Sequence, residues 1–187
     1  MGRPKMLLPW GGSTVLGHLI AMWKRLGAAQ IAVVCASTDT AIIAELDRLG
    51  FPVANRIFNP QPGRGMFSSI QCAARWPGWK PALTHWAIVL GDQPHLRLET
   101  LQTLVDFAAT QPGKICQPSR QGRARHPVVL PETAFKKLAG SQDETLKQFL
   151  QSQSPDLRQV ELDDPRFDLD LDRPEDYEKA RQMYTGG

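Results

Sequence analysis

A short acidic segment stands where a protein could bind a divalent metal ion. Gly91-Asp92-Gln93-Pro94 directly follows Trp86–Leu90, an apolar run that predicts a buried strand. In parallel sheets the loops at the carboxyl ends of the strands hold the ligands, and hard cations prefer carboxylate oxygens. Asp92 is therefore a candidate ligand for a metal that a substrate phosphate carries. A plain turn or a helix N-cap accounts for the same residues equally well.

A second acidic segment alternates aspartate with apolar residues near the C-terminal end of the sequence. Phe167–Asp172 reads Phe-Asp-Leu-Asp-Leu-Asp, and this period of two predicts a strand with Asp168, Asp170 and Asp172 on one face. Their mutual repulsion is costly unless they share a cation. An exposed edge strand leading into a helix at Pro174 is the alternative. Three carboxylates on one face just before a helix favour the metal interpretation.

A glycine- and proline-rich loop, Asn59–Ser69, runs into a predicted helix and is a candidate phosphate-binding segment. Such loops let the backbone approach a ligand closely, and a helix N-terminus attracts anions. An ordinary connection capped by Ser68 or Ser69 is the alternative interpretation. Lys5 adds a candidate point charge for a phosphate. Neither G-x-G-x-x-G nor G-x-x-x-x-G-K-[ST] occurs, so the Rossmann dehydrogenases and P-loop enzymes lack their defining segments here.

The histidine and arginine residues indicate a functional site less clearly than the acidic and glycine-rich segments do. The four histidines show no metal-binding spacing, and only His126 is a candidate site residue. The G-x-S-x-G pattern of serine hydrolases is absent. Arg120, Arg123 and Arg125 form a cluster that suits a small anionic ligand, although solvated loop arginines are the simpler interpretation. A net charge of +3 is too small to indicate nucleic-acid binding.

Predicted strands and helices alternate along the sequence, which is typical of a parallel α/β sheet. The predicted strands are Ile31–Ala36 (covered on both faces), Phe51–Ala54, Trp86–Leu90, Lys114–Gln117 and Pro127–Leu130. The predicted helices are Thr14–Leu26, Thr38–Leu49 (capped by Ser37 or Thr38), Ser68–Trp76, Leu98–Ala109, Pro131–Leu138, Asp143–Leu150 and one that begins at Pro174. Because no stretch has the composition of a linker, we expect residues 1–187 to form one domain.

The composition is that of a globular protein. Of 187 residues, 42% are hydrophobic and 22% charged, which excludes intrinsic disorder, collagen and coiled coil. The apolar stretches are too short to span a membrane, and the N-terminal segment does not resemble a signal peptide. Cys35, Cys72 and Cys116 are widely spaced and indicate buried thiols in a reducing cytoplasm, rather than disulfides or a zinc site.

Taken in order, these segments resemble the MobA-like nucleotidyltransferases, and most closely their molybdenum cofactor cytidylyltransferase branch. The resemblance covers nearly the whole chain, and five weak matches in the right order are together specific. The matching segments are Met1–Pro9 (the end of L-A-A-G-x-S-x-R-M-G-x-P-K), Asn59 with Gly65-Met66-x-x-Ser69-Ile70 (the nucleotide-side loop), Gly91–Pro94 (the metal motif), His126–Val128 (G-H-P-V) and Asp170–Tyr177 (D-I-D-T-P-E-D-Y).

The resemblance implies a three-layer α/β/α, modified Rossmann-like fold of the nucleotide-diphospho-sugar transferase type, with a mostly parallel sheet. It implies Mg²⁺-dependent transfer of a nucleotide monophosphate from an NTP to a phosphorylated acceptor, with release of pyrophosphate. CTP is favoured because Gly91–Pro94 reads G-D-Q-P, in place of the C-D-x-P common in guanylyl enzymes. The implied acceptor is of the molybdopterin type, with a molybdenum hydroxylase as a candidate partner and with neither nucleic acid nor membrane.

Residue roles follow from the resemblance position by position. Lys5 and Asp92 are the implied catalytic residues, and Asp92 and Asp172 are the implied Mg²⁺ ligands. The implied acceptor-side residues are His126, Asp170 and Asp172. The implied nucleotide-binding residues are Gly2, Arg3, Lys5, Asn59, Gly65 and Ser69.

Three departures from the family pattern affect these expectations. Arg125 stands where the family has the glycine before H-P-V, and residues 140–145 replace its G-D-x-G-A-R segment. Both departures concern the acceptor, so a sugar-phosphate transferase and a non-catalytic chaperone that delivers pterin to a molybdenum hydroxylase are the alternatives. The strand and glycine-rich loop that begin the family signature have no counterpart before Met1. We interpret this as a misplaced start, and expect residues 1–187 to bind NTP weakly and to gain activity and stability from an upstream segment.

Overall fold

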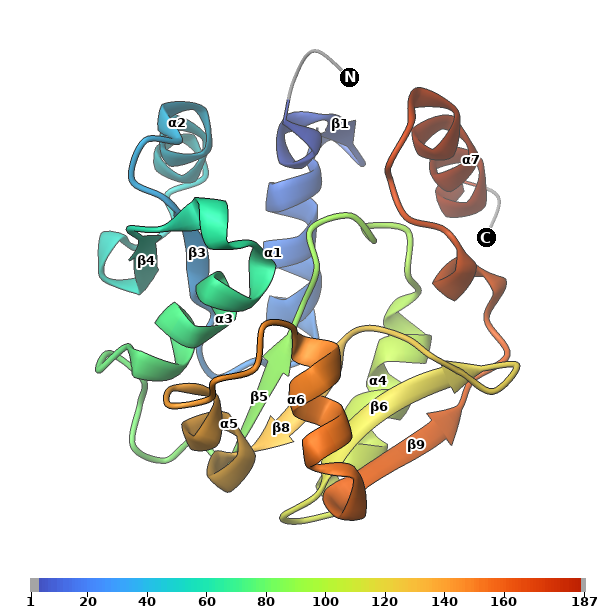
Figure 1. The fold of residues 1–187 in the computed structure, drawn as a ribbon. Helices are drawn as coiled ribbons and strands as arrows, with labels where there is room; N and C mark the ends of the chain where they lie inside the picture. The colour runs from blue at the N-terminus through green and yellow to red at the C-terminus, as the bar shows by residue number, and fades with distance from the viewer. Residues whose placement is uncertain (1–3, 186–187) are drawn as a thin grey trace.

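A five-stranded sheet occupies the centre of the fold and carries the loops of the candidate site (Figure 1). The computed structural model describes residues 4–185. Its strands are β1 (Pro9–Trp10), β2 (Ser13–Thr14), β3 (Val33–Ala36), β4 (Arg56–Asn59), β5 (His85–Ile88), β6 (Ile115–Arg120), β7 (Arg123–Ala124), β8 (Val128–Pro131) and β9 (Leu157–Glu161). The central sheet has the order β5-β8-β6-β7, and β9 pairs with β6. β3 and β4 form a separate parallel pair, and β1 and β2 a short hairpin.

Helices form at every position where the sequence predicts one. They are α1 (Val15–Arg25), α2 (Thr40–Arg48), α3 (Met66–Arg75), α4 (Leu98–Ala109), α5 (Glu132–Leu138), α6 (Leu146–Ser152) and α7 (Pro174–Thr185). The predicted bounds of α4 are confirmed at both ends. The predicted cap of α2 is wrong, because the side chain of Asp39 accepts the Ile42 N–H. α6 begins after Thr145 rather than at Asp143, because Thr145 and Gln148 form a reciprocal capping box.

The central sheet agrees with the predicted mostly parallel arrangement in that β5, β6 and β9 all run in one direction, while β8 and the two-residue β7 run against them. β6 runs parallel to β9 but antiparallel to β8, and β5 also runs antiparallel to β8. The chain reverses tightly at Gln121 and Gly122, and no helix separates this turn from β8. A parallel neighbour needs a long crossover, so β8 returns antiparallel to β6.

One strand of the predicted alternation is wrong, and the sequence did not predict β1, β2, β4, β7 or β9. Phe51–Ala54 is not a strand, because Pro52 cannot donate a ladder hydrogen bond. A 3₁₀ turn at Val53–Asn55 follows this proline instead, and β4 begins only at Arg56. β9 was missed because only Leu157 and Val160 of its five residues are apolar.

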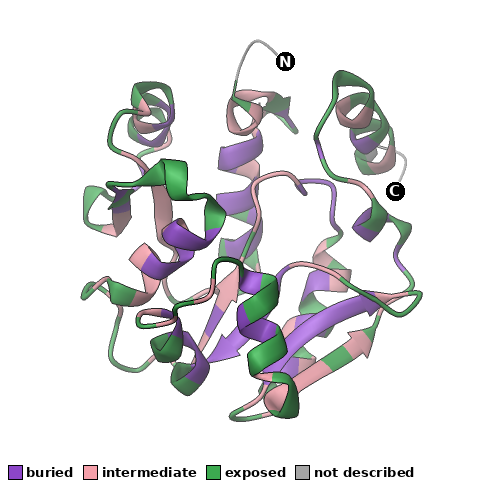
Figure 2. Ribbon diagram, viewed as in Figure 1, coloured by how far each residue is buried: buried purple, intermediate pink, exposed green. Residues whose placement is uncertain are grey.

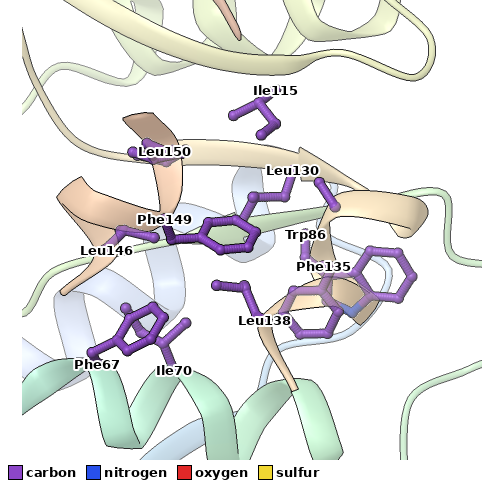
Figure 3. Packing of buried hydrophobic residues seen from close by; sticks show 12 residues of the cluster. Phe67, Ile70, Trp86, Ile115, Leu130, Phe135, Leu138, Leu146, Phe149 and Leu150 are labelled. Carbon is purple, nitrogen blue, oxygen red and sulfur yellow. The ribbon is translucent and has the colours of Figure 1, made fainter. Parts of the chain in front are cut away.

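Helices cover both faces of the sheet, which confirms the three-layer α/β/α prediction. On one face Leu130 of β8 packs among residues of α3, α5 and α6 (Figure 3). On the other face Val129 of β8 contacts a cluster that includes Leu104 of α4, while α1 covers the neighbouring part of that face. Successive residues of a strand point to opposite faces, so β8 joins both layers. β6 and β8 are accordingly almost wholly buried (Figure 2).

β3 is only half-buried, which corrects the expectation of a strand covered on both faces. Each of its four residues has intermediate exposure (Figure 2). Within residues 4–185, β3 pairs with β4 along one edge and shares no ladder with β5. The second edge of this apolar strand therefore lacks a strand neighbour in the described part of the chain. No helix within residues 4–185 is long and apolar enough to cross a membrane.

Candidate active site

The loop after β5 meets the C-terminal acidic segment at the carboxyl end of the strand. The backbone oxygen of Asp92 accepts a hydrogen bond from the Leu171 N–H at 3.1 Å. Gln93 Nε2 donates to Asp170 Oδ1 at 2.8 Å, across 77 residues of sequence. The fold therefore brings the two predicted acidic segments together.

Lys5 joins the same cluster from the opposite end of the chain. Its Nζ lies 2.6 Å from Asp172 Oδ1, and this contact with an ammonium group lowers the pKa of Asp172. The charge of Lys5 also acts on the pKa of Asp92, in the lowering direction. The side chains of Lys5 and Asp172 are 36% and 69% exposed. An incoming cation or phosphate therefore has access to both partners of the pair.

Asp92 lies in surroundings that disfavour a negative charge. Burial raises the pKa of Asp92 most, and the charges of Asp170 and Asp172 raise it further. Its Oδ1 is buried without a hydrogen-bond partner among residues 4–185. A bound cation would relieve both conditions, and Mg²⁺ is commonly held by one or two carboxylates together with substrate phosphates. Asp92 and Asp172 therefore fit a divalent metal that enters with a phosphate.

The aspartates of the C-terminal segment do not share a strand face, so the strand on which both the shared-cation interpretation and its edge-strand alternative depend is wrong. Pro165–Asp168 is a 3₁₀ turn, capped by Asp164, and the residues after it form no strand. Each carboxylate has its own partner: Asp168 pairs with Arg120 and Arg125, Asp170 with Gln93, and Asp172 with Lys5. Within the described residues no group of three acidic, histidine or cysteine side chains is arranged to hold a metal.

One buried side chain fixes the glycine-rich loop after β4. Asn59 is 2% exposed, and its Nδ2 donates to the hydroxyls of Ser68 at 2.8 Å and Ser69 at 3.0 Å. Its Oδ1 accepts the Gln61 N–H at 2.8 Å. Gly65 then takes a left-handed φ of +83° directly before α3. This loop leaves its strand on the same side as the loop of Asp92 (Figure 1), so the N-terminus of α3 is available to an anion there.

Replacing Asn59 with alanine is expected to destabilise the protein by about 1–3 kcal/mol, because it leaves buried hydrogen-bonding groups unpaired. For a chain of this size that corresponds to a fall in melting temperature of about 2–12 °C. Asn55→Ala is the matched control, since Asn55 makes only a 3.4 Å contact with Gln30 Nε2. Thermal unfolding followed by circular dichroism measures both variants. Equal melting temperatures for the two would contradict the anchoring role of Asn59.

His126 lies in the loop before β8, preceding a cis proline. Its Nδ1 is buried without a partner in the described part of the chain. Burial lowers the pKa of His126, and the charge of Asp170 opposes this shift, so the neutral ring is favoured near pH 7. Asp170 acts electrostatically on both His126 and Asp92. It therefore links the predicted acceptor-side histidine to the predicted metal ligand.

The structure thus gathers Lys5, Asp92, Asp170 and Asp172 and places His126 within electrostatic reach of Asp170. Gly2 and Arg3 lie outside the described residues. Sequence reasoning did not predict a role for Gln93, although it is part of the quoted G-D-Q-P segment. Its contact with Asp170 depends on the fold and has no local signal.

Comparison with known proteins identifies the family of this chain. The sequence profile of the MobA-like NTP transferase domain matches residues 1–158. The chain belongs to the MobA-like NTP transferase family. Molybdenum cofactor cytidylyltransferase of Escherichia coli (strain K12) is 24% identical to this MobA-like chain, over 99% of the chain and 91% of that protein.

Solved structures share the MobA-like fold. A Mycobacterium tuberculosis H37Rv protein, crystallised in complex with manganese, is 25% identical, with a TM-score of 0.72 over 97% of this chain and 93% of its own. A nucleotidyl transferase from Methanothermobacter is 17% identical, with a TM-score of 0.78 over 97% and 85%. The chain is therefore a nucleotidyltransferase in family and fold, of the nucleotide-diphospho-sugar transferase type.

Proposed function

We propose that this protein transfers a nucleotide monophosphate from CTP to a phosphorylated acceptor of the molybdopterin type and releases pyrophosphate. The observation that carries the proposal is the cluster of Lys5, Asp92 and Asp172 at the end of β5, with an orphaned buried carboxylate oxygen on Asp92. Transfer of this kind depends on positioning and charge neutralisation and needs little covalent chemistry from the protein. Metal binding by the similar M. tuberculosis protein supports a divalent ion.

In the proposed reaction the Lys5–Asp172 ion pair opens as the substrate enters. The ammonium of Lys5 moves to the triphosphate, and Asp172 is then free to join Asp92 as a metal ligand. Mg²⁺, when bound, neutralises the charge that develops on the transferred and leaving phosphates. Asn59, Gly65 and Ser69 shape the loop that borders the nucleotide. His126 and Asp170 border the acceptor.

The choice of CTP and of a molybdopterin-type acceptor rests on two observations. The metal motif reads G-D-Q-P rather than C-D-x-P, and the curated relative is named as a molybdenum cofactor cytidylyltransferase. We further propose that residues 1–187 act as one domain and pass the product to a molybdenum hydroxylase.

A screen of the four common NTPs against phosphorylated acceptors, with pyrophosphate release as the readout, tests the proposal. We expect turnover with CTP, molybdopterin and Mg²⁺ together, and much less when GTP replaces CTP. Turnover with GTP but not with CTP would contradict the proposed nucleotide. Turnover with a sugar phosphate but not with molybdopterin would contradict the proposed acceptor. Pterin binding without any pyrophosphate release would overturn the transferase in favour of a cofactor chaperone.

As the pH is lowered, the metal affinity is expected to begin to fall at a higher pH than it would for an exposed aspartate. The raised pKa of Asp92 means that a proton competes with the cation at a pH above the ordinary value of 3.8 for this group. A Mn²⁺ titration at several pH values between about 4 and 7 measures the effect. Affinity that stays constant over this range would contradict the role of Asp92 as a ligand.

A further inference from the structure

The side chain of Gln93 helps to join the loop after β5 to the C-terminal acidic segment. Its Nε2 donates to Asp170 Oδ1 at 2.8 Å. At the next position of the segment, the N–H of the fully buried Leu171 binds the backbone oxygen of Asp92. Asp170 is therefore held both at its carboxylate and through the backbone that follows it.

Gln93 is itself held firmly in the protein interior. Its side chain is 6% exposed and lines a small cavity together with Leu19 and Met22 of α1 and Leu101 of α4. These apolar neighbours offer no partner to the carboxamide, and a buried amide donor costs free energy unless an acceptor binds it. The Asp170 carboxylate supplies that acceptor. The hydrogen bond to Asp170 therefore comes from a side chain with little freedom to move.

Asp170 differs from the neighbouring aspartates in the charge of its partner. Asp168 pairs with arginine side chains and Asp172 with Lys5, whereas Asp170 takes part in no ion pair within residues 4–185 and bonds to the neutral amide of Gln93. An N–H that donates to an ionised carboxylate makes a strong bond and fixes the carboxylate without neutralising it. Asp170 is also exposed. It therefore keeps its charge and its access to a ligand while its position is fixed.

The fixed carboxylate lies between the two halves of the candidate site. The charge of Asp170 raises the pKa of Asp92 on one side and acts in the same direction on the pKa of His126 on the other. A carboxylate in this place could bind either the metal or an N–H or O–H group of the acceptor substrate. Because no three acidic, histidine or cysteine side chains of the described chain are arranged around a common metal position, the geometry favours the acceptor substrate.

We propose that Gln93 is a positioning residue that fixes the Asp170 carboxylate to accept an N–H or O–H group of the acceptor substrate, while Asp92 and Asp172 hold the metal. This inference rests on the proposed function, in which Asp170 borders the acceptor. The group recognised is a hydrogen-bond donor separate from the phosphate that reacts, such as an amino or ring N–H group of a pterin. Gln93 acts through Asp170 and does not itself contact the substrate.

Two measurements on the full chain test this role. One is the binding of molybdopterin in the absence of CTP, followed by isothermal titration calorimetry, and the other is the pair of KM values in the transfer reaction. Gln93→Leu should weaken acceptor binding about two- to tenfold, because Asp170 must then be ordered when the acceptor binds. Asp170→Ala removes the contact itself and should weaken binding about tenfold or more. In both variants the KM for the acceptor should rise and the KM for CTP should stay unchanged.

A double-mutant cycle separates positioning through Asp170 from a general structural effect. In an Asp170→Ala protein, Gln93→Leu should cause no further loss of acceptor binding. Gln102→Leu is the matched control, because Gln102 Nε2 donates to Asp106 Oδ1 at the same 2.8 Å on the exposed side of α4, and it should leave binding unchanged.

A second substitution keeps the test valid if the leucine variant does not fold. Gln93→Asn keeps the amide but ends one methylene short of Asp170, so it should weaken acceptor binding as Gln93→Leu does. Thermal melting shows which of the two variants is folded.

Unchanged acceptor binding in the folded Gln93 variants, or an equal loss with and without Asp170, would overturn the inference. Equal rises in the KM for CTP and for the acceptor would also overturn it, as would failure of the unaltered chain to bind molybdopterin. Pyrophosphate release reports on the proposed function separately. Release by the unaltered chain with unchanged binding in the Gln93 variants would overturn the positioning role alone. Weakened binding in these variants without pyrophosphate release under any condition would contradict the transferase and keep the role of Gln93.

Discussion

Replacing Asp92 with asparagine is expected to abolish nucleotidyl transfer while making the protein more stable. Loss of the carboxylate removes the ligand that holds the metal on the phosphates, an effect worth several kcal/mol in the transition state and thus about 10³-fold or more in rate. The folded-state pKa of Asp92 is raised, so its ionised form destabilises the folded chain near pH 7. The carboxamide of asparagine carries no charge, so the substitution removes a buried negative charge and should raise the melting temperature.

The other aspartates provide graded controls for this prediction. Asp172→Asn should impair pyrophosphate release nearly as strongly, because Asp172 is the second proposed ligand. Asp168→Asn should impair it much less, because that carboxylate contacts arginines rather than the metal. Pyrophosphate release and thermal unfolding are measured on the same preparations. Equal and mild effects of all three substitutions would contradict a metal site at Asp92.

Phe135→Ala is expected to cause the largest loss of stability. Phe135 is 3% exposed and stacks on Trp86 with ring centroids 4.7 Å apart and planes 5° from parallel (Figure 3). A buried phenylalanine reduced to alanine costs about 3–5 kcal/mol, or about 6–20 °C in melting temperature at this chain length.

Val53→Ala serves as the surface control for this substitution, because Val53 is 71% exposed. Its free energy of unfolding, measured by thermal unfolding, should lie within about 0.5 kcal/mol of that of the unaltered protein. If the Phe135→Ala variant melted at the same temperature as the Val53→Ala variant, the aromatic stack would contribute little to the stability of the core.

Local chemistry explains why the helices were predicted well and parts of the sheet were not. Thr145 and Gln148 mark the start of α6 by side chains three residues apart, which is information that the sequence contains. β9 exists because Leu157–Glu161 pairs in parallel register with β6, whose residues lie about 40 positions earlier. Its own composition carries no such signal, and strand direction in the central sheet likewise depends on distant partners.

In the candidate site, too, features with a local sequence signal were predicted, and features that depend on distant contacts were not. The residue type and position of Asp92 after a strand suggested a metal ligand, the acidic pattern suggested Asp172 and the charge suggested Lys5. The family resemblance then gave these residues their specific roles. The alternation of residue types in Phe167–Asp172 gave a wrong prediction, because a period of two is typical of a strand and this segment forms none. The segment instead gives each aspartate a separate partner, and the contact of Asp170 with Gln93 comes from the tertiary fold alone.

Water-proton relaxation with Mn²⁺ and CTP responds to the metal–nucleotide complex bound to protein, so it tests most directly whether Asp92 holds the metal. We expect the unaltered chain to enhance relaxation and Asp168→Asn to do so with unchanged affinity. Asp92→Asn should lower the affinity at least about tenfold, equivalent to about 1.4 kcal/mol. Binding by Asp92→Asn as tight as that of the unaltered chain would contradict the assignment of Asp92 as the metal ligand.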